Sequence, residues 1–290
     1  MAEEIPPPSA APPDPAAAPS APRWVRRFDG YDRSLHVLLM SSFLGLAFTG
    51  LPLLFSERAW AAKLSRIVGG FQAAGFLHRV FALCMLLTFG LHLARLLKKI
   101  FGDRDYGILW GPRSMVPRLE DLKQLIGHVR WFVGRGPRPD FDRYTYWEKF
   151  DYWAVFWGMG IIGGSGLILW FPKFWARFLP GDLFNVGLLV HGEEALLATV
   201  FIFTVHFFNG HLRPEKFPMD TVIFTGVLPL DEVRHERPAE YARLIAEGGI
   251  EEITAPPPDP EILKRGRIVG STAVLLGLLL VTLTLYALLT

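Results

Sequence analysis

Five long apolar runs limit what this chain can fold into. They cover about residues 35–55, 74–97, 152–171, 186–208 and 268–289. Each run is close to the ~20 residues that a helix needs to cross the hydrocarbon of a bilayer. Helices are expected there, because open strands would leave backbone groups unpaired in lipid. The sequence therefore predicts an all-α integral membrane protein, in which four helices form a bundle and a fifth is added at the C-terminus.

Composition excludes several classes of function. The 290 residues are 51% hydrophobic and 20% charged, which is too apolar for an ordinary soluble enzyme or a nucleic-acid-binding protein. The single cysteine, Cys84, cannot build a disulfide framework within the chain, a zinc ribbon or a cysteine-ligated iron–sulfur cluster. Covalent c-type heme needs a C-x-x-C-H sequence, which a single cysteine cannot supply.

The basic residues predict how the chain is oriented in the membrane. Of the 30 Lys and Arg residues, 24 lie in residues 1–35, 95–151 and 209–267, whereas the two short loops between helices hold five. The positive-inside rule therefore places the N-terminus and both long loops in the cytoplasm. The short loops and the C-terminus are expected on the periplasmic side of a bacterial inner membrane.

The segments outside the membrane carry their own expectations. Residues 1–22 are rich in alanine and proline and are expected to form a disordered cytoplasmic tail. Residues 23–241 are expected to form the membrane domain, with a cytoplasmic loop at 98–151, followed by a linker at 242–267 and the fifth helix at 268–290. Apolar residues at helical spacing predict an amphipathic helix at 119–132. His128 on that helix is expected to be a solvated surface side chain.

Five of the eight histidines lie in or at the predicted membrane helices: His36, His78, His92, His191 and His206. Ionisable residues in a membrane are costly, and they are candidates for function by default. One such histidine could simply be hydrogen-bonded in the core, but these five lie at two depths. His78 and His92 are 14 residues apart, and His191 and His206 are 15 apart. These separations correspond to ~21–22 Å along a helix and return to nearly the same face.

Paired imidazoles from facing helices are what a non-covalent b-type heme needs, because they fill both axial positions of the iron. Two such hemes at two depths would form an electron path across the membrane. A zinc site would prefer clustered ligands, and a metal transporter would be expected to carry carboxylates at mid-depth. The alternative is a non-heme membrane anchor or transporter whose histidines are structural.

Several short motifs follow one another along the chain. They are Arg27-Phe28 with Asp32-Arg33-x-x-His36, Leu77-His78, Arg95, the stretch Arg143 to Lys149, His191 with Ala195 and His206, Pro218-Met219, Gly226-Val227, and Glu236-Arg237-Pro238. In order and spacing these motifs, from about Arg26 to Tyr241, resemble the diheme cytochrome b subunits of formate dehydrogenases, which are related to those of Ni/Fe hydrogenases and thiosulfate reductases.

The resemblance implies two bis-histidine b hemes and a quinone site. The outer heme would be held by His78 and His191, and the inner heme by His36 and His206. Menaquinone or ubiquinone would bind near the inner heme, close to the segment that begins at Tyr144. The candidates for quinone contact or proton handling are Arg33, Tyr144, Thr145, Glu148 and Lys149, with Asp151, His211 and Arg213 also at the cytoplasmic end.

The chain departs from the family pattern at several places. Thr145 stands where the family has asparagine. The fourth helix has a histidine spacing of 15 instead of 14, which requires a small helix distortion. His92 and His211 are additional, as is the fifth helix, which is expected to pack against a partner or to cap the bundle.

His92 leaves other ligand schemes open. His92 with His206 would give the ligand scheme of the cytochromes b in quinol:cytochrome c reductases. His36 is preferred because the Asp32-Arg33-x-x-His36 motif matches the family. His92 with His211 would be needed for a third heme.

The expected function is that of an electron-transfer subunit in a quinone-linked oxidoreductase complex. The sequence has no visible pterin, flavin, iron–sulfur or c-heme motif. The primary oxidation or reduction is therefore expected on a periplasmic partner, which would be either an iron–sulfur subunit or a multiheme cytochrome c.

Overall fold

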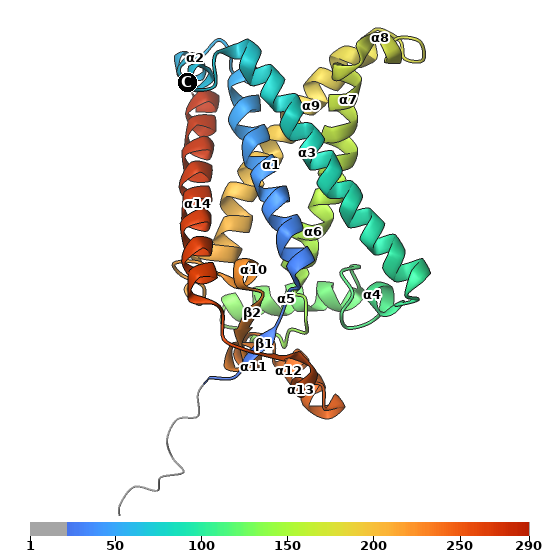
Figure 1. Cartoon of the computed structure of the whole chain (residues 1–290), viewed down its shortest axis with the longest axis vertical. Helices are drawn as coiled ribbons and strands as arrows, with labels where there is room; N and C mark the ends of the chain where they lie inside the picture. Colours follow the sequence, from blue (N-terminus) through green and yellow to red (C-terminus); the bar gives the residue numbers. More distant parts are fainter. Residues whose placement is uncertain (1–21, 290) are drawn as a thin grey trace, which may run out of the picture.

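A computed structural model describes residues 22–289, so the expected tail at 1–22 lies outside the described residues except for Pro22. Five helices are long and apolar enough to cross a membrane, and they stand beside one another (Figure 1). The prediction of an all-α membrane bundle is thereby confirmed. The five spans are α1 (Gly30–Leu54), α3 (Phe71–Leu97) with η2 (Lys98–Gly102), α6 (Tyr146–Gly158) with η3 (Met159–Gly163) and α7 (Gly164–Trp170), α9 (Asp182–Phe201) with η4 (Ile202–His206) and η5 (Phe208–Leu212), and α14 (Pro260–Leu289).

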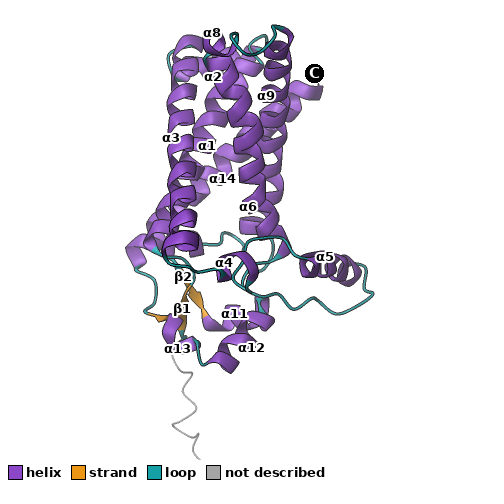
Figure 2. Cartoon of the chain, turned by 90° about the vertical axis from the view of Figure 1, so that its right-hand side faces the viewer, coloured by secondary structure: helices purple, strands orange, loops and turns teal. Residues whose placement is uncertain are grey.

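The connecting segments fall into two sets at opposite ends of the bundle. The short loops contain α2 (Ala59–Ile67) and α8 (Pro172–Trp175), and they lie at the same end as the C-terminus (Figure 1). The longer segments gather at the other end (Figure 2). They contain α4 (Gly107–Trp110), α5 (Leu119–Phe132), α10 (Val222–Thr225), α11 (Leu230–Glu236), α12 (Pro238–Glu247) and α13 (Ile250–Ile253). The segments that are rich in Lys and Arg therefore share one end.

The membrane helices begin before the apolar runs that predict them. The third span starts at Tyr146 and not at 152, because Thr145 and Glu148 form a capping box. The Thr145 hydroxyl accepts a hydrogen bond from the Glu148 N–H at 3.3 Å, and the Glu148 carboxylate accepts one from the Thr145 N–H at 2.8 Å. Polar residues can therefore extend a helix beyond the hydrocarbon.

A small antiparallel sheet closes the end of the bundle that holds the longer segments, and it was not expected from the sequence. Its order is β2 (Val227–Pro229), β1 (Trp24–Arg26) and β3 (Thr254–Ala255). Val25 is buried against Leu228 and Val233. The segment 242–267, the predicted linker, contains the end of α12, α13, β3 and the first turns of α14. We call this sheet and α11–α13 the cap.

Helix α5 has the bounds that the apolar pattern predicts, Leu119–Phe132. The expectation that His128 is solvated is wrong, because this side chain is buried. Its ring stacks on Phe132, and its Nδ1 lies 3.0 Å from the Tyr146 hydroxyl. Burial lowers the pKa of His128, so the imidazole is neutral near pH 7.

Helix α14 packs on the bundle through its glycines. A Cβ added at Gly277 would lie 2.6 Å from the rings of both Phe203 and Phe207. Those rings belong to the largest apolar core, which also contains Leu280 of α14 and Leu51 of α1. Helix α14 therefore packs against the other spans of its own chain, whereas contact with a partner stays a prediction.

Candidate heme sites

The side chains of His78 and His191 face each other between α3 and α9. Their ring centroids are 6.2 Å apart, and the ring planes are inclined by 82°. Metal–imidazole bonds measure about 2 Å. If one metal ion lay between the two imidazoles, the ring centroids would be separated by two metal–nitrogen bonds and two ring radii. That sum is close to the observed separation of the centroids. The pair therefore has the separation needed to hold one metal ion from opposite sides.

The Nδ1 atoms of both imidazoles are engaged by the helices around them. The His78 Nδ1 lies 3.2 Å from the Thr49 hydroxyl of α1. The His191 Nδ1 donates to the Ile162 carbonyl at 3.0 Å and lies 3.3 Å from the Ser165 hydroxyl. Hydrogen bonds at Nδ1 fix the ring and its tautomer, and they leave the Nε2 lone pair available, as in metal-ligating histidines.

Two glycines make room for these rings. A Cβ at Gly50 would lie 2.9 Å from the Cε1 atom of His78, and a Cβ at Gly166 would lie 3.1 Å from the Cε1 atom of His191. A Cβ at Gly50 would force the His78 ring to shift, and a Cβ at Gly166 would press the His191 ring by a few tenths of an ångström. The outer pair is thus closely bordered by a glycine on each side.

The outer pair supplies two nitrogen ligands and no more. Within residues 22–289, no group of three or more His, Cys, Asp or Glu side chains could hold a metal ion. A porphyrin supplies the other four ligands itself, so a two-imidazole site fits heme iron.

Three histidines form the inner set: His36 from α1, His206 from η4 and His211 from η5. They lie close enough for their charges to interact. His206 donates through Nδ1 to Asp151 of α6 at 2.9 Å. The Nδ1 atoms of His36 and His211 are buried and have no hydrogen-bond partner among the described residues. Buried polar atoms of this kind call for an explanation, such as a bound group.

The fourth span contains the distortion that its histidine spacing requires. Residues Ile202–His206 form a π-helical turn, which lies between His191 and His206. A π-helical turn bonds i to i+5 and so absorbs one additional residue. His191 and His206 are therefore oriented much as two residues 14 apart would be on a regular α-helix. The expected distortion is confirmed.

His92 points toward the third span. Its Nε2 lies 3.0 Å from the Tyr152 hydroxyl, and its ring packs against Phe156. The nitrogen that would bind a metal is therefore already paired with a phenol.

Three of the quinone and proton candidates have structural partners. Thr145 forms the cap of α6, and Glu148 accepts two hydrogen bonds from Arg237 at 2.9 and 3.0 Å. The Lys149 ammonium is buried and lies 2.7 Å from the Asp121 carboxylate of α5. The T-x-x-E spacing of a capping box is a sequence signal for the first of these roles.

The other candidates have more varied surroundings. The Nε atom of Arg33 is buried without a partner in the described part of the chain, and the Arg33 side chain runs beside Gly226. Tyr144 lies under the guanidinium groups of Arg27 and Arg143, 5.4 and 5.6 Å from its ring centroid. Arg213 donates to Glu236 at 2.9 Å.

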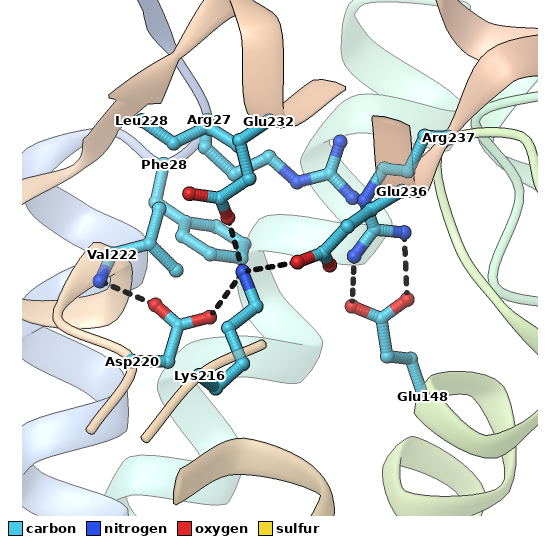
Figure 3. Close-up of a pocket in the computed structure, with 10 residues that line it drawn as sticks. All are labelled: Arg27, Phe28, Glu148, Lys216, Asp220, Val222, Leu228, Glu232, Glu236 and Arg237. Atoms are coloured by element: carbon cyan, nitrogen blue, oxygen red, sulfur yellow. Dashed lines mark hydrogen bonds and ion pairs between the residues drawn. The ribbon is translucent and has the colours of Figure 1, made fainter. Parts of the chain in front are cut away.

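A small cavity of about 40 Å³ lies within an ion-pair cluster under the cap. Figure 3 shows Lys216 facing three carboxylates, with the Arg237–Glu148 pair beside it. Burial would lower the pKa of Lys216, but these carboxylates (Asp220, Glu232 and Glu236) outweigh it and raise the pKa. The volume suits one or two water molecules and is too small for a porphyrin or a quinone ring. The cluster thus ties the cap to the bundle.

Sequence reasoning missed the residues that orient the histidines. Thr49, Ser165 and Tyr152 contact His78, His191 and His92 respectively. The available signal was a hydroxyl residue in an apolar helix near the depth of a histidine.

Comparisons with known proteins show sequence similarity to membrane cytochromes b. No protein-family model matches the chain. The nitrate-inducible formate dehydrogenase cytochrome b556(Fdn) subunit of Escherichia coli is 20% identical over 179 residues, which are 61% of this chain and 74% of that protein. The cytochrome b556(fdo) subunit of formate dehydrogenase from the same organism is 26% identical over 183 residues, 63% of this chain and 76% of that protein. The chain is therefore a distant homologue of the cytochrome b subunits of formate dehydrogenases, as its motifs indicate.

Proposed function

We propose that this chain is a membrane cytochrome b subunit that transfers electrons between a periplasmic redox partner and the quinone pool through two bis-histidine b hemes. The observation that carries the proposal is the facing pair His78 and His191, with a 6.2 Å ring separation and both Nδ1 atoms engaged. A b heme held by two imidazoles has no open position, so when bound it supplies electron transfer.

At the outer level, His78 and His191 would hold the heme through Nε2. Thr49 and the Ile162 carbonyl would fix the two rings before the heme binds, which lowers the entropic cost of binding. Gly50 would keep the space beside His78 open.

At the inner level, His36 and His206 would be the ligands. The Asp151 carboxylate orients His206 through Nδ1, which directs Nε2 away from the carboxylate. His36 is favoured over His92 because the Nε2 of His92 is paired with the Tyr152 hydroxyl. For the same reason we do not assign a third heme to His92 and His211.

Quinone would bind at the end of the bundle that carries the inner histidines. Reduction of a quinone takes up two protons, so titratable groups are needed there. His211 has an unpartnered Nδ1 and Asp151 an unpartnered Oδ1 among the described residues, and Arg33 lies at the same end. Thr145, Glu148 and Lys149 would hold this region in shape, and Tyr144 would border it.

The orientation of the complex follows from charge. The long basic segments would face the cytoplasm and the short loops the periplasm of a bacterial inner membrane. The relatives are named as subunits of formate dehydrogenases. We therefore place an iron–sulfur subunit or a multiheme cytochrome c at the short-loop end, as the electron donor or acceptor for the outer heme.

The test is a reduced-minus-oxidised spectrum of the purified chain with a heme assay. We expect two b hemes per chain. The substitutions H78A and H191A should each remove one heme, and H36A and H206A should each remove the other.

The controls separate ligands from other histidines. H92A should retain both hemes, as should H235A, whose side chain is exposed in the cap. A colourless protein would favour the non-heme anchor or transporter. Loss of the inner heme in H92A, with its retention in H36A, would replace the inner ligand that we assign.

A further inference from the structure

Helix α5 carries an apolar face that no part of the described chain covers. The side chains of Leu119, Leu122, Ile126, Val129 and Phe132 are 53–80% exposed. At 100° per residue these positions fall on one side of the helix. Exposed apolar surface of this kind marks an interaction with another apolar phase or protein.

The helix contacts its own chain through the opposite, more polar side. Asp121 binds the buried Lys149 ammonium at 2.7 Å, and His128 is buried among aromatic rings. Gly127 lies against Pro139. A helix of a soluble domain would bury its apolar face against its own chain. The apolar face of α5 is exposed, so another molecule or the membrane must cover it.

The contacts of α5 set its level along the bundle. The Lys149–Asp121 pair holds its first turn beside the first turn of α6. Just before α5, the Met115 carbonyl accepts a hydrogen bond from the Trp153 indole at 2.9 Å. The apolar run of the third span begins at about residue 152, so α5 lies near the boundary between hydrocarbon and water. In Figure 1 it runs across the direction of the membrane helices, and in Figure 2 it extends to one side of the bundle.

The charges around α5 suit a negatively charged surface. Its exposed basic residues, counting those just before and after it, are Arg113, Arg118, Lys123, Arg130 and Arg135. The acidic residues of α5 are both paired, Glu120 with Lys123 at 3.2 Å and Asp121 with Lys149 at 2.7 Å. Arg113 lies 3.5 Å from Asp105, so Arg118, Arg130 and Arg135 are the exposed basic residues for which no ion pair is seen among the described residues. Basic residues beside an apolar helix face are the pattern of a helix that lies in a membrane interface rich in anionic lipid.

We propose that α5 is an in-plane membrane helix, whose apolar face inserts into the leaflet at the inner-histidine end and whose basic residues bind anionic phospholipid headgroups. The five spans already place this end of the chain at a bilayer, so the covering phase is present wherever the protein is.

Spin labelling of the full chain in nanodiscs tests the proposal. In a C84S background, one label is attached to I126C on the apolar face or to K123C on the polar side. Discs hold one chain each and contain phosphatidylcholine with or without phosphatidylglycerol. We expect the label at 126 to collide with oxygen and to be shielded from a water-soluble nickel chelate, and the label at 123 to show the reverse.

Two results would overturn the proposal. Equal exposure of both labels to the nickel chelate would place the apolar face in water. Shielding at position 126 that appears only in discs with two chains would assign the face to a second copy.

The binding of anionic headgroups by the basic residues of α5 is tested separately. Native mass spectrometry of the R130Q/R135Q variant should show a lower preference for phosphatidylglycerol over phosphatidylcholine, by on the order of fivefold per charge removed. The matched control K63Q/R66Q, at the other end of the bundle, should lower it less. An unchanged preference in R130Q/R135Q would overturn headgroup binding by α5.

Discussion

Asp151 accepts a 2.9 Å hydrogen bond from Nδ1 of His206, so a carboxylate of the third span orients an imidazole of the fourth. A carboxylate in this position fixes the tautomer of a ligand histidine and raises its basicity. The contact links two helices at the level of the inner histidines.

We expect the D151N substitution to weaken inner heme binding by about 10–100-fold, the range for loss of such a partner. The heme that remains should have a raised reduction potential, because a less basic imidazole stabilises the oxidised iron less. Heme content and a redox titration measure both effects. D182N, in the first turn of α9 at the other end of the bundle, should change neither. Full heme content and an unshifted potential in D151N would remove Asp151 from this role.

Glycine substitution should empty the outer site without touching a ligand. In G166V, the added side chain meets the His191 ring, because even a Cβ would lie 3.1 Å from its Cε1. Overpacking of this kind costs about 1–3 kcal/mol and displaces the ring. We expect loss of the outer heme alone, seen as half the heme per chain. In the matched variant G164V, the Cβ meets no described atom within 4 Å, and both hemes should remain.

The cap should depend on a buried ion pair. Glu240 is 3% exposed and lies 2.9 Å from Arg27 and 3.3 Å from Arg143. E240Q would leave buried guanidinium groups without their counter-charge, a loss of about 3–5 kcal/mol. Faster hydrogen exchange at the β1 amides should report it. E251Q breaks the exposed pair with Arg23 and should cost only about 0–1 kcal/mol. Equal exchange rates in both variants would contradict a structural role for Glu240.

Acid should remove a contact between the ends of α1 and α3. The hydrogen bond from Arg95 lowers the pKa of Asp29 from 3.8 to about 2. Because the folded-state pKa is the lower one, the contribution is complete above about pH 4 and is lost as pH falls through 2. Asp29 also caps α1, so D29A should cost about 0.5–2 kcal/mol at neutral pH.

Thermal unfolding of wild type and D29A from pH 6 to pH 2 provides the measurement. The two midpoints should differ at pH 6 and converge toward pH 2. A constant difference across this range would show that the charge of Asp29 does not contribute.

The membrane helices were predictable because each is a long apolar run, a signal that needs no knowledge of tertiary contacts. Helix α5 was predictable for a similar reason, since its pattern is local. A small distortion of the fourth span followed from comparing its histidine spacing of 15 with the family's 14, but the π-helical form of the turn at Ile202–His206 did not. Local periodicity and spacing thus carried most of the fold.

The remaining features depend on contacts between distant residues. The three strands are two or three residues long and have no periodicity, and β1 pairs with segments about 200 residues later. His128 lies on a helix whose polar side packs inward, so its burial has no local signal. Lys149 is a sequence-based candidate for quinone contact or proton handling, and its pairing with Asp121, 28 residues away, has no local signal.

The central position of β1 has a consequence for synthesis. Strand β1 leaves the ribosome before the first membrane helix, whereas both of its neighbours, β2 and β3, emerge only after the fourth span. The nascent chain must therefore insert four helices before the edges of β1 can be covered. A ribosome that stops between residues 213 and 226 would release a protein that has four of its five spans and in which both edges of β1 are open to other proteins.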